Sequence, residues 1–189
     1  MKKIFLFSFF MFIVFSLCSQ TKKIDETIFC DEISLEGSVP ASGNGYIYIY
    51  VDNKNNTYIS SAFYTWDTYI MSSRGIVTDN ERKEIVSLLE KSLNWHDLAI
   101  QEKIDFKKNM GTYYKEYGIR ECGVKIDFSS KKNGKENGVI ITLKDFSEPL
   151  YCVIFLDYEK ILKLIELLKK IPEVYKILKE EEKVLEKFK

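Results

Sequence analysis

The chain repeats one layout of apolar runs and turns at a spacing of 79 residues. The run 46–51, YIYIYV, is followed by a turn at 52–56 and a second apolar run. Ile126 lies 79 residues after Ile47, and a second turn follows it at 131–135. Few identities accompany the match, so either duplication or two hairpins of equal length would produce it. In both cases the layout predicts two βββα units.

The first unit has strand signals followed by a helix start. Runs at 46–51, 57–64 and 68–77 are rich in β-branched and aromatic residues, and Gly75 marks a possible bulge in the third. Thr78 and Glu81 have the capping-box spacing, which predicts that a helix begins there.

The second unit has the same order. It has strand-like runs at 118–130, 138–143 and 150–156, and Asp157 can cap the helix that follows. Pro172 ends that helix or starts another.

We therefore expect an α+β fold, a largely antiparallel sheet of about six strands with the helices packed on one face and an extra C-terminal helix. A sheet curled around one long C-terminal helix is the alternative. An edge strand over 26–36 would add to the sheet. The predicted segments, within one compact domain, are a signal peptide (1–18), a lead-in (19–45), the first unit (46–106), a polar linker (107–117), the second unit (118–171) and an amphipathic helix (172–189).

The N-terminus predicts export. A short basic region precedes an apolar run over 4–17, which is short for a bilayer-spanning helix and suits a signal peptide. Cleavage after Cys18 places the protein in the periplasm or outside the cell. Acylation of Cys18 would make it a membrane-anchored lipoprotein, although Leu17 is larger than the residue expected before a lipidated cysteine. We expect membrane contact only in that case.

Charge and motif content exclude several classes of function. The 28 basic and 28 acidic residues cancel, so nucleic-acid binding is not favoured. No phosphate-binding glycine motif is present, and we expect no cofactor. The cysteines have no Cys-x-x-Cys spacing and no neighbouring histidine, which argues against a metal site.

The tyrosines of the first strand form the main candidate site. If Ile47 and its alternating neighbours face the core, then Tyr46, Tyr48 and Tyr50 face the other way, and Tyr58 can join them across the hairpin. In the second unit the matching outward residues are Lys125, Asp127 and Ser129, which we expect to be solvated. The tyrosines either form an exposed binding surface or lie under the lead-in or the terminal helix as a second core layer.

Catalytic signals are weak. The single histidine, His96, lies beside Trp95 near a helix end, where a surface or capping role is commoner than catalysis. Asp67 and Asp127 are the acids that a hydrolase would use. If a disulfide forms, Cys30 with Cys122 or Cys152 fits better than Cys122 with Cys152, whose strands lie two apart.

We therefore expect a non-enzymatic binding or structural module of the bacterial envelope that holds a protein, peptide or glycan on its tyrosines. A small envelope hydrolase, or a small-ligand carrier with a pocket between helices and sheet, is the alternative. A sheet edge could also pair two copies into a homodimer.

Overall fold

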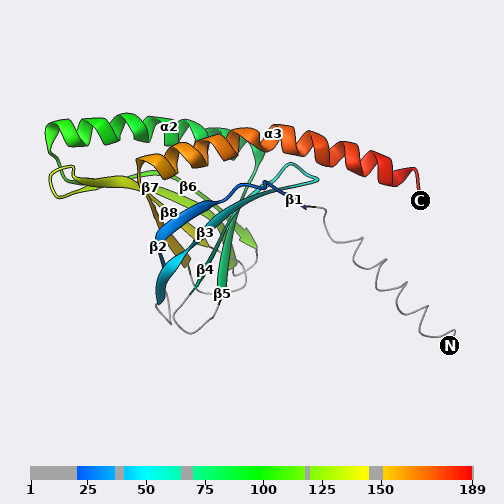
Figure 1. Cartoon of the computed structure of the whole chain (residues 1–189), viewed down its shortest axis with the longest axis horizontal. Coiled ribbons are helices and arrows are strands. Elements are labelled where there is room, and N and C mark those ends of the chain that lie inside the picture. Colours follow the sequence, from blue (N-terminus) through cyan, green and yellow to red (C-terminus); the bar gives the residue numbers. More distant parts are fainter. Residues whose placement is uncertain (1–20, 37–40, 65–69, 118–119, 145–150, 189) are drawn as a thin grey trace.

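A computed structural model describes residues 21–36, 41–64, 70–117, 120–144 and 151–188 (Figure 1). These ranges contain nine strands and two helices. The strands are β1 (Thr21–Lys23), β2 (Ile28–Glu36), β3 (Ala41–Asp52), β4 (Thr57–Tyr64), β5 (Ile70–Val77), β6 (Phe106–Tyr117), β7 (Arg120–Lys131), β8 (Glu136–Lys144) and β9 (Tyr151–Leu156), and the helices are α2 (Asp79–Glu102) and α3 (Tyr158–Glu186).

The strands form one antiparallel sheet in the order β5-β4-β3-β2-β9-β8-β7-β6, and β1 pairs with β3. The pairing of β2 with β9 joins a first half, β1 to β5, to a second half, β6 to β9. The sheet is curved so that its two halves face each other. Strands β4 and β9 are separated by β3 and β2 in the sheet order, yet the Ser61 Oγ of β4 donates to the Cys152 Sγ of β9 at 3.1 Å. Both helices lie along one side of this curved sheet, as Figure 1 shows. The predicted α+β class and antiparallel sheet are confirmed.

The spacing of 79 residues is present in the folded chain. It separates the starts of β3 and β7, of β4 and β8, and of α2 and α3. The predicted number of strands is too low, because β1, β2 and β6 add to the six of the two units. The edge strand predicted over 26–36 exists as β2, but it lies inside the sheet between β3 and β9. Residues 107–117, predicted as a polar linker, belong to β6, which pairs with β7 along its length. Strand β6 ends the sheet order, and the solvated side chains of such a strand give it the composition of a linker.

Gly75 has a role other than the predicted bulge. The register of β4 with β5 continues through Ile59 and Gly75 without a shift. A Cβ atom at position 75 would lie 2.5 Å from the carbonyl oxygen of Gly123 in β7. Glycine is therefore required where β5 crosses closely over β7.

The start of α2 confirms the predicted capping box. The backbone N–H of Thr78 donates to Glu81 Oε2 at 2.6 Å, and Glu81 N–H donates to Thr78 Oγ1 at 3.4 Å. Asp157 caps α3 in the same place of the second half, accepting from Lys160 N–H at 3.0 Å.

The predicted separate C-terminal helix is wrong, because Pro172 lies inside the continuous helix α3. Proline has no N–H to donate to the carbonyl four residues before it, which here is Leu168. The Arg82 Nη1 of α2 donates to that oxygen at 2.8 Å. The neighbouring helix thus supplies the hydrogen bond that Pro172 cannot make.

The core lies between the helices and the inner face of the sheet. The predicted inward residues of β3 and β7 are fully or almost fully buried, as are the leucines of α3 that pack against them: Ile47, Ile49, Val51, Val124, Ile126, Phe128, Leu164, Leu167 and Leu168. Burial on alternate strand positions confirms that the even-numbered residues of β3 point to the outer face.

Within the described ranges, neither helix combines the length and the hydrophobicity needed to cross a bilayer. The predicted signal peptide and Cys18 lie outside the described residues.

Candidate functional site

Five aromatic side chains occupy the outer face of the first half, and we call them the tyrosine face: Phe29, Tyr46, Tyr48, Tyr50 and Tyr58. They come from β2, β3 and β4. Phe29 stands directly opposite Tyr46, and Tyr50 directly opposite Tyr58. Residues paired in this way lie on the same side of a sheet, so adjacent strands hold the rings together.

Ring contacts run along the tyrosine face. The centroids of Phe29 and Tyr46 lie 5.3 Å apart in an edge-on arrangement, and those of Tyr46 and Tyr48 lie 6.3 Å apart. Lys23 of β1 places its Nζ 4.2 Å from the centroid of the Tyr48 ring. This distance is within the range of a cation–π contact, so the lead-in covers one ring with a charged side chain.

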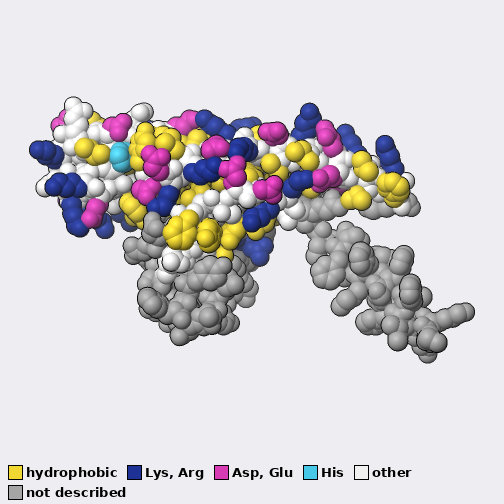
Figure 2. Space-filling view, in the orientation of Figure 1, with side chains coloured by type: hydrophobic (Ala, Val, Ile, Leu, Met, Phe, Trp, Pro, Cys, Tyr) yellow, Lys and Arg dark blue, Asp and Glu magenta, His cyan; other side chains and the backbone are white. Residues whose placement is uncertain are grey.

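The tyrosine face is neither fully open nor a second core layer. Phe29 is 44% exposed, and the four tyrosines are half-buried. The terminal helix packs on the opposite, inner face of the sheet and therefore does not form the cover. Figure 2 shows hydrophobic side chains gathered below the helices, over the region where Figure 1 draws β2 and β3.

Asp52 fixes one end of the tyrosine face. Its Oδ2 accepts from the Tyr58 hydroxyl at 3.0 Å and from Asn56 Nδ2 at 2.9 Å. Its Oδ1 accepts from the backbone N–H groups of Lys54 and Asn56 at 2.9 and 2.8 Å. Burial opposes ionisation, but these hydrogen bonds outweigh it and the pKa of Asp52 is lowered. The carboxylate therefore holds the β3–β4 turn and the Tyr58 ring in place.

The outer face of the second half differs from the prediction. Asp127, expected to be solvated, is only 3% exposed, and Ser129 is also buried. Asp127 accepts from Lys125 Nζ at 2.8 Å and from Asn109 Nδ2 at 2.9 Å, and Lys107 Nζ lies 3.6 Å away. Asn109 and Lys107 belong to β6, the strand that was read as a linker. The prediction failed because it left out the strand that covers Asp127.

Asp127 does not have the environment of a catalytic acid. Burial would raise its pKa, but the hydrogen bonds from Lys125 and Asn109 and the charges of Lys125 and Lys107 lower it overall. A general acid at neutral pH needs a raised pKa instead. Asp67, the other predicted acid, lies outside the described residues.

His96 lies at the surface of α2, away from the tyrosine face. Its Nδ1 is 3.4 Å from the Asp97 carboxylate, and its ring packs against Tyr158 with centroids 4.8 Å apart. The described residues contain no group of three or more His, Cys, Asp or Glu side chains that could hold a metal ion.

The three described cysteines, Cys30, Cys122 and Cys152, are buried thiols, and no disulfide joins any two of them. Burial raises the pKa of Cys152 to about 11, and the hydrogen bond from Ser61 offsets only part of that rise. Such a thiol stays protonated and unreactive at neutral pH.

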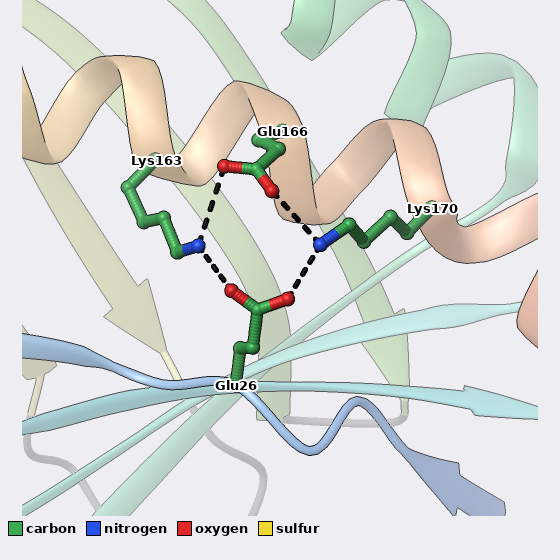
Figure 3. Close-up of polar contacts among 4 residues, drawn as sticks. All are labelled: Glu26, Lys163, Glu166 and Lys170. Atoms are coloured by element: carbon green, nitrogen blue, oxygen red, sulfur yellow. Dashed lines mark hydrogen bonds and ion pairs between the residues drawn. The ribbon is translucent and has the colours of Figure 1, made fainter.

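The link between β1 and β2 is tied to α3 by a ring of charges (Figure 3). Glu26 accepts from Lys163, and from Lys170 at 2.5 Å. Glu166 closes the ring, 3.3 Å from Lys163 and 2.8 Å from Lys170. The hydrogen bonds from the two lysines lower the pKa of Glu26 to about 2. This ring holds the lead-in, and with it β1 and Lys23, in a fixed position beside the tyrosine face.

Sequence reasoning missed Phe29 and Lys23 as members of the site. The signal was present, since Phe29 alternates with the apolar residues Ile28 and Cys30 as an outward strand residue would. It was overlooked because the strand expected over 26–36 was placed at a sheet edge, and its pairing with β3, which sets Phe29 opposite Tyr46, was not foreseen.

No protein-family model matches the chain, and no curated protein matches it. Among solved structures, the chain is similar to a crystal structure of an SsgA-like sporulation-specific cell division protein from Thermobifida fusca YX-ER1. The TM-score is 0.32 and the sequence identity 16%, over 84% of this chain and 85% of that chain. A likeness at this TM-score carries no argument about function.

Proposed function

We propose that the protein is an exported, non-enzymatic binding module that holds a protein, peptide or glycan of the bacterial envelope on the tyrosine face. The observation that carries the proposal is the row of partly exposed aromatic rings on the outer face of β2, β3 and β4. A core layer would bury these rings, and an ordinary solvated strand would carry polar residues there.

The physical properties of the surface fit this role. A large aromatic side chain has roughly 150–250 Å² to bury. Phe29 is 44% exposed and each of the four tyrosines keeps a smaller part of its surface accessible, so the five rings form an apolar patch on the order of 300 Å². Tyrosine offers a flat apolar ring together with a hydroxyl, and it loses little conformational entropy on binding. The rings stand on paired strands, so the surface is largely ordered before a ligand arrives.

The test is an affinity capture from envelope extract of the source organism. The bait is wild-type protein or the variant Tyr46→Ser, Tyr48→Ser, Tyr50→Ser, and bound peptides and glycans are identified by mass spectrometry. We expect a ligand that the wild type retains and the triple variant loses.

A matched control is Tyr114→Ser. Tyr114 is half-buried in β6 on the second half and, like Tyr48, has a lysine near its ring, with Lys144 Nζ 5.6 Å from the centroid. Circular dichroism must show that every variant is folded. Equal loss of the ligand in the Tyr114 variant, or retention in a folded triple variant, would contradict the proposal.

Export has a separate test. The intact mass of the protein recovered from the envelope should correspond to loss of residues 1–18 or 1–19. A mass that retains Cys18 with added acyl chains would identify the lipoprotein form. A full-length mass in the cytoplasm would refute export.

The hydrolase alternative has less support. It requires a carboxyl group with a raised pKa, and the partners of Asp127 lower its pKa.

A further inference from the structure

A row of outward side chains crosses three strands of the first half. Tyr48 of β3 stands directly opposite Ser60 of β4, and Ser60 stands directly opposite Arg74 of β5. Directly opposed side chains lie on the same side of a sheet, so Arg74 is on the outer face together with the tyrosines. Arg74 is exposed. A cation therefore stands on the β5 side of the tyrosine face.

Lys23 places a second cation on the other side of the rings. Strand β1 pairs with the end of β3, and β4 pairs with the same residues of β3 along the opposite edge. Lys23 is exposed, and its Nζ lies 4.2 Å from the centroid of the Tyr48 ring. The tyrosine face is thus flanked by a positive charge on each side.

The acids of this region do not neutralise the two cations. Asp52 is only 3% exposed, and both of its oxygens accept hydrogen bonds from the β3–β4 turn or from Tyr58. Asp25 is exposed in the link between β1 and β2, and Lys54 is exposed in the turn. Apart from Asp52 and Arg74, the outward residues of β3, β4 and β5 with described side chains are uncharged: Asn44, Tyr46, Tyr48, Tyr50, Tyr58, Ser60, Ala62 and Ile76. The accessible charge of this surface is positive, which favours an anionic ligand.

Short side chains separate the rings from Arg74. Ser60 stands opposite Tyr48, and Ala62 stands opposite Tyr46. Neither is long enough to cover the ring beside it, so the flank of each ring on the β4 side is left open. A ligand that packs against Tyr46 or Tyr48 can therefore extend over β4 and reach Arg74.

The position of the surface within the sheet favours a glycan over a peptide. Extended peptides bind sheets by adding a strand to a free edge, where main-chain groups are available. Strands β3 and β4 each have a neighbouring strand on both sides, so they offer no such edge. The surface offers instead flat rings for the apolar face of a sugar, hydroxyl groups, and an arginine that can hold a carboxylate or phosphate by two parallel hydrogen bonds.

We propose that the tyrosine face binds an acidic oligosaccharide, whose carboxylate or phosphate groups contact Lys23 and Arg74 while its sugar rings pack on the tyrosines. Three strand spacings, roughly 14 Å, separate the backbones of Lys23 and Arg74 across the sheet. The ligand therefore carries acid groups on more than one sugar unit. This inference rests on the proposed function and narrows its ligand to one chemical class.

The test is isothermal titration calorimetry of the wild type at low salt with two oligosaccharides, hexagalacturonate and a phosphorylated mannose pentamer. Binding of one or both is expected, and which one binds tells carboxylate from phosphate recognition. The fully methyl-esterified hexagalacturonate is the matched ligand, since it keeps the sugar chain and lacks the charges. We expect an acidic form to bind at least about tenfold more tightly than its neutral counterpart, and high salt to reduce that difference.

Variants assign the charge dependence to the two cations. Arg74→Met and Lys23→Met should each weaken binding of the acidic oligosaccharide about tenfold, and the double variant should lose the dependence on salt. Lys144→Met is the matched control, because Lys144 also lies beside a tyrosine ring, in the second half. The control should bind like the wild type, and circular dichroism should show every variant folded.

Three results would overturn this inference and leave the proposed function to its own capture experiment. The first is equal affinity for the acidic and the methyl-esterified oligosaccharide. The second is binding of hexaglutamate, an acidic peptide, without binding of either saccharide. The third is the absence of binding of every probe.

Discussion

The two halves of the sheet carry the same kind of side chain on the inner face and different chemistry on the outer face. Ile47 of β3 and Ile126 of β7, 79 residues apart, are both fully buried against the helices. On the outer face, Tyr48 occupies the position that matches Asp127. Tyr48 is half-buried among aromatic rings, whereas Asp127 is buried among lysines and an asparagine.

The contrast shows that the fold requires apolar residues on the inner face of both halves but does not determine the residues of the outer face. Both inner faces must exclude water, so both carry aliphatic residues. The outer faces have no such common requirement. The second half buries Asp127 among charged and polar side chains on its outer face, and the first half leaves aromatic rings partly exposed to solvent.

The largest expected effect concerns the shared inner face. Ile47→Ala and Ile126→Ala should each lower the free energy of unfolding by about 2–5 kcal/mol, because each leaves a cavity in a fully packed core. Urea unfolding followed by circular dichroism measures both. A loss in one half several times that in the other would show that the two inner faces are not equivalent.

The next effect concerns the helices, which differ at Pro172 of α3 and the matching Leu93 of α2. Arg82→Met should cost about 1–3 kcal/mol, because the Leu168 carbonyl then loses its donor. In a Pro172→Ala background the cost should fall, since the backbone N–H that alanine restores can donate to the Leu168 carbonyl. A double-mutant cycle in urea measures the difference, and strict additivity of the two changes would refute this account of Pro172.

Asp127→Asn tests the closed outer face and should cost about 1–3 kcal/mol at pH 7. The pKa of Asp127 is lowered in the folded state, so its ionised form stabilises the fold above the unfolded pKa near 3.8. That contribution disappears as the pH falls through the folded pKa. The stability of the Asn variant should therefore converge with that of the wild type in acid. A constant difference between pH 7 and pH 2 would contradict the assignment.

A smaller effect compares Tyr48 with Tyr114, which both stand beside a lysine. Tyr48→Ser and Tyr114→Ser should each cost about 0.5–1 kcal/mol, the value of an exposed cation–π contact. Only Tyr48→Ser should weaken binding of the captured ligand, which isothermal titration calorimetry measures. Weakening by Tyr114→Ser alone would move the site to the second half.

The smallest effect concerns Glu26, whose matching residue is Asp105. Glu26 binds two lysines of α3, and Asp105 accepts from the Asn133 N–H at 2.6 Å. The folded pKa of Glu26 is about 2, so its contribution is present above the unfolded value of 4.5 and is lost as the pH falls toward 2. Glu26→Gln should speed amide hydrogen exchange in 22–27 at low salt, and high salt should remove the difference. A difference that persists in high salt would mean that packing, not charge, holds this segment.

Local signals predicted much of this fold. The alternation of Tyr46–Val51, the turns and the capping box at Thr78 each depend on neighbouring residues, so the sequence contains them directly. The alternation also predicted which tyrosines share a face, because strand side chains alternate wherever the strand lies.

The errors arose where distant residues decide the outcome. Residues 107–117 are polar by composition and become a strand because β7 pairs with them. Pro172 stays inside a helix because Arg82, 90 positions earlier, donates to Leu168. Whether the tyrosine face is covered depends on which face of the sheet the helices pack against. Local periodicity shows which residues share a face but does not show which face the helices cover.

The pairing of β2 with β9 also has a consequence for the order of folding. Ile33 pairs with Ile154, so every element from β3 to β8 lies between the two strands that join the halves. Contacts of such high sequence separation form late, because a long loop must close first. The sheet therefore cannot be completed until the last strand is available. The export proposed above would then act on a chain in which the junction between the two halves has not yet formed.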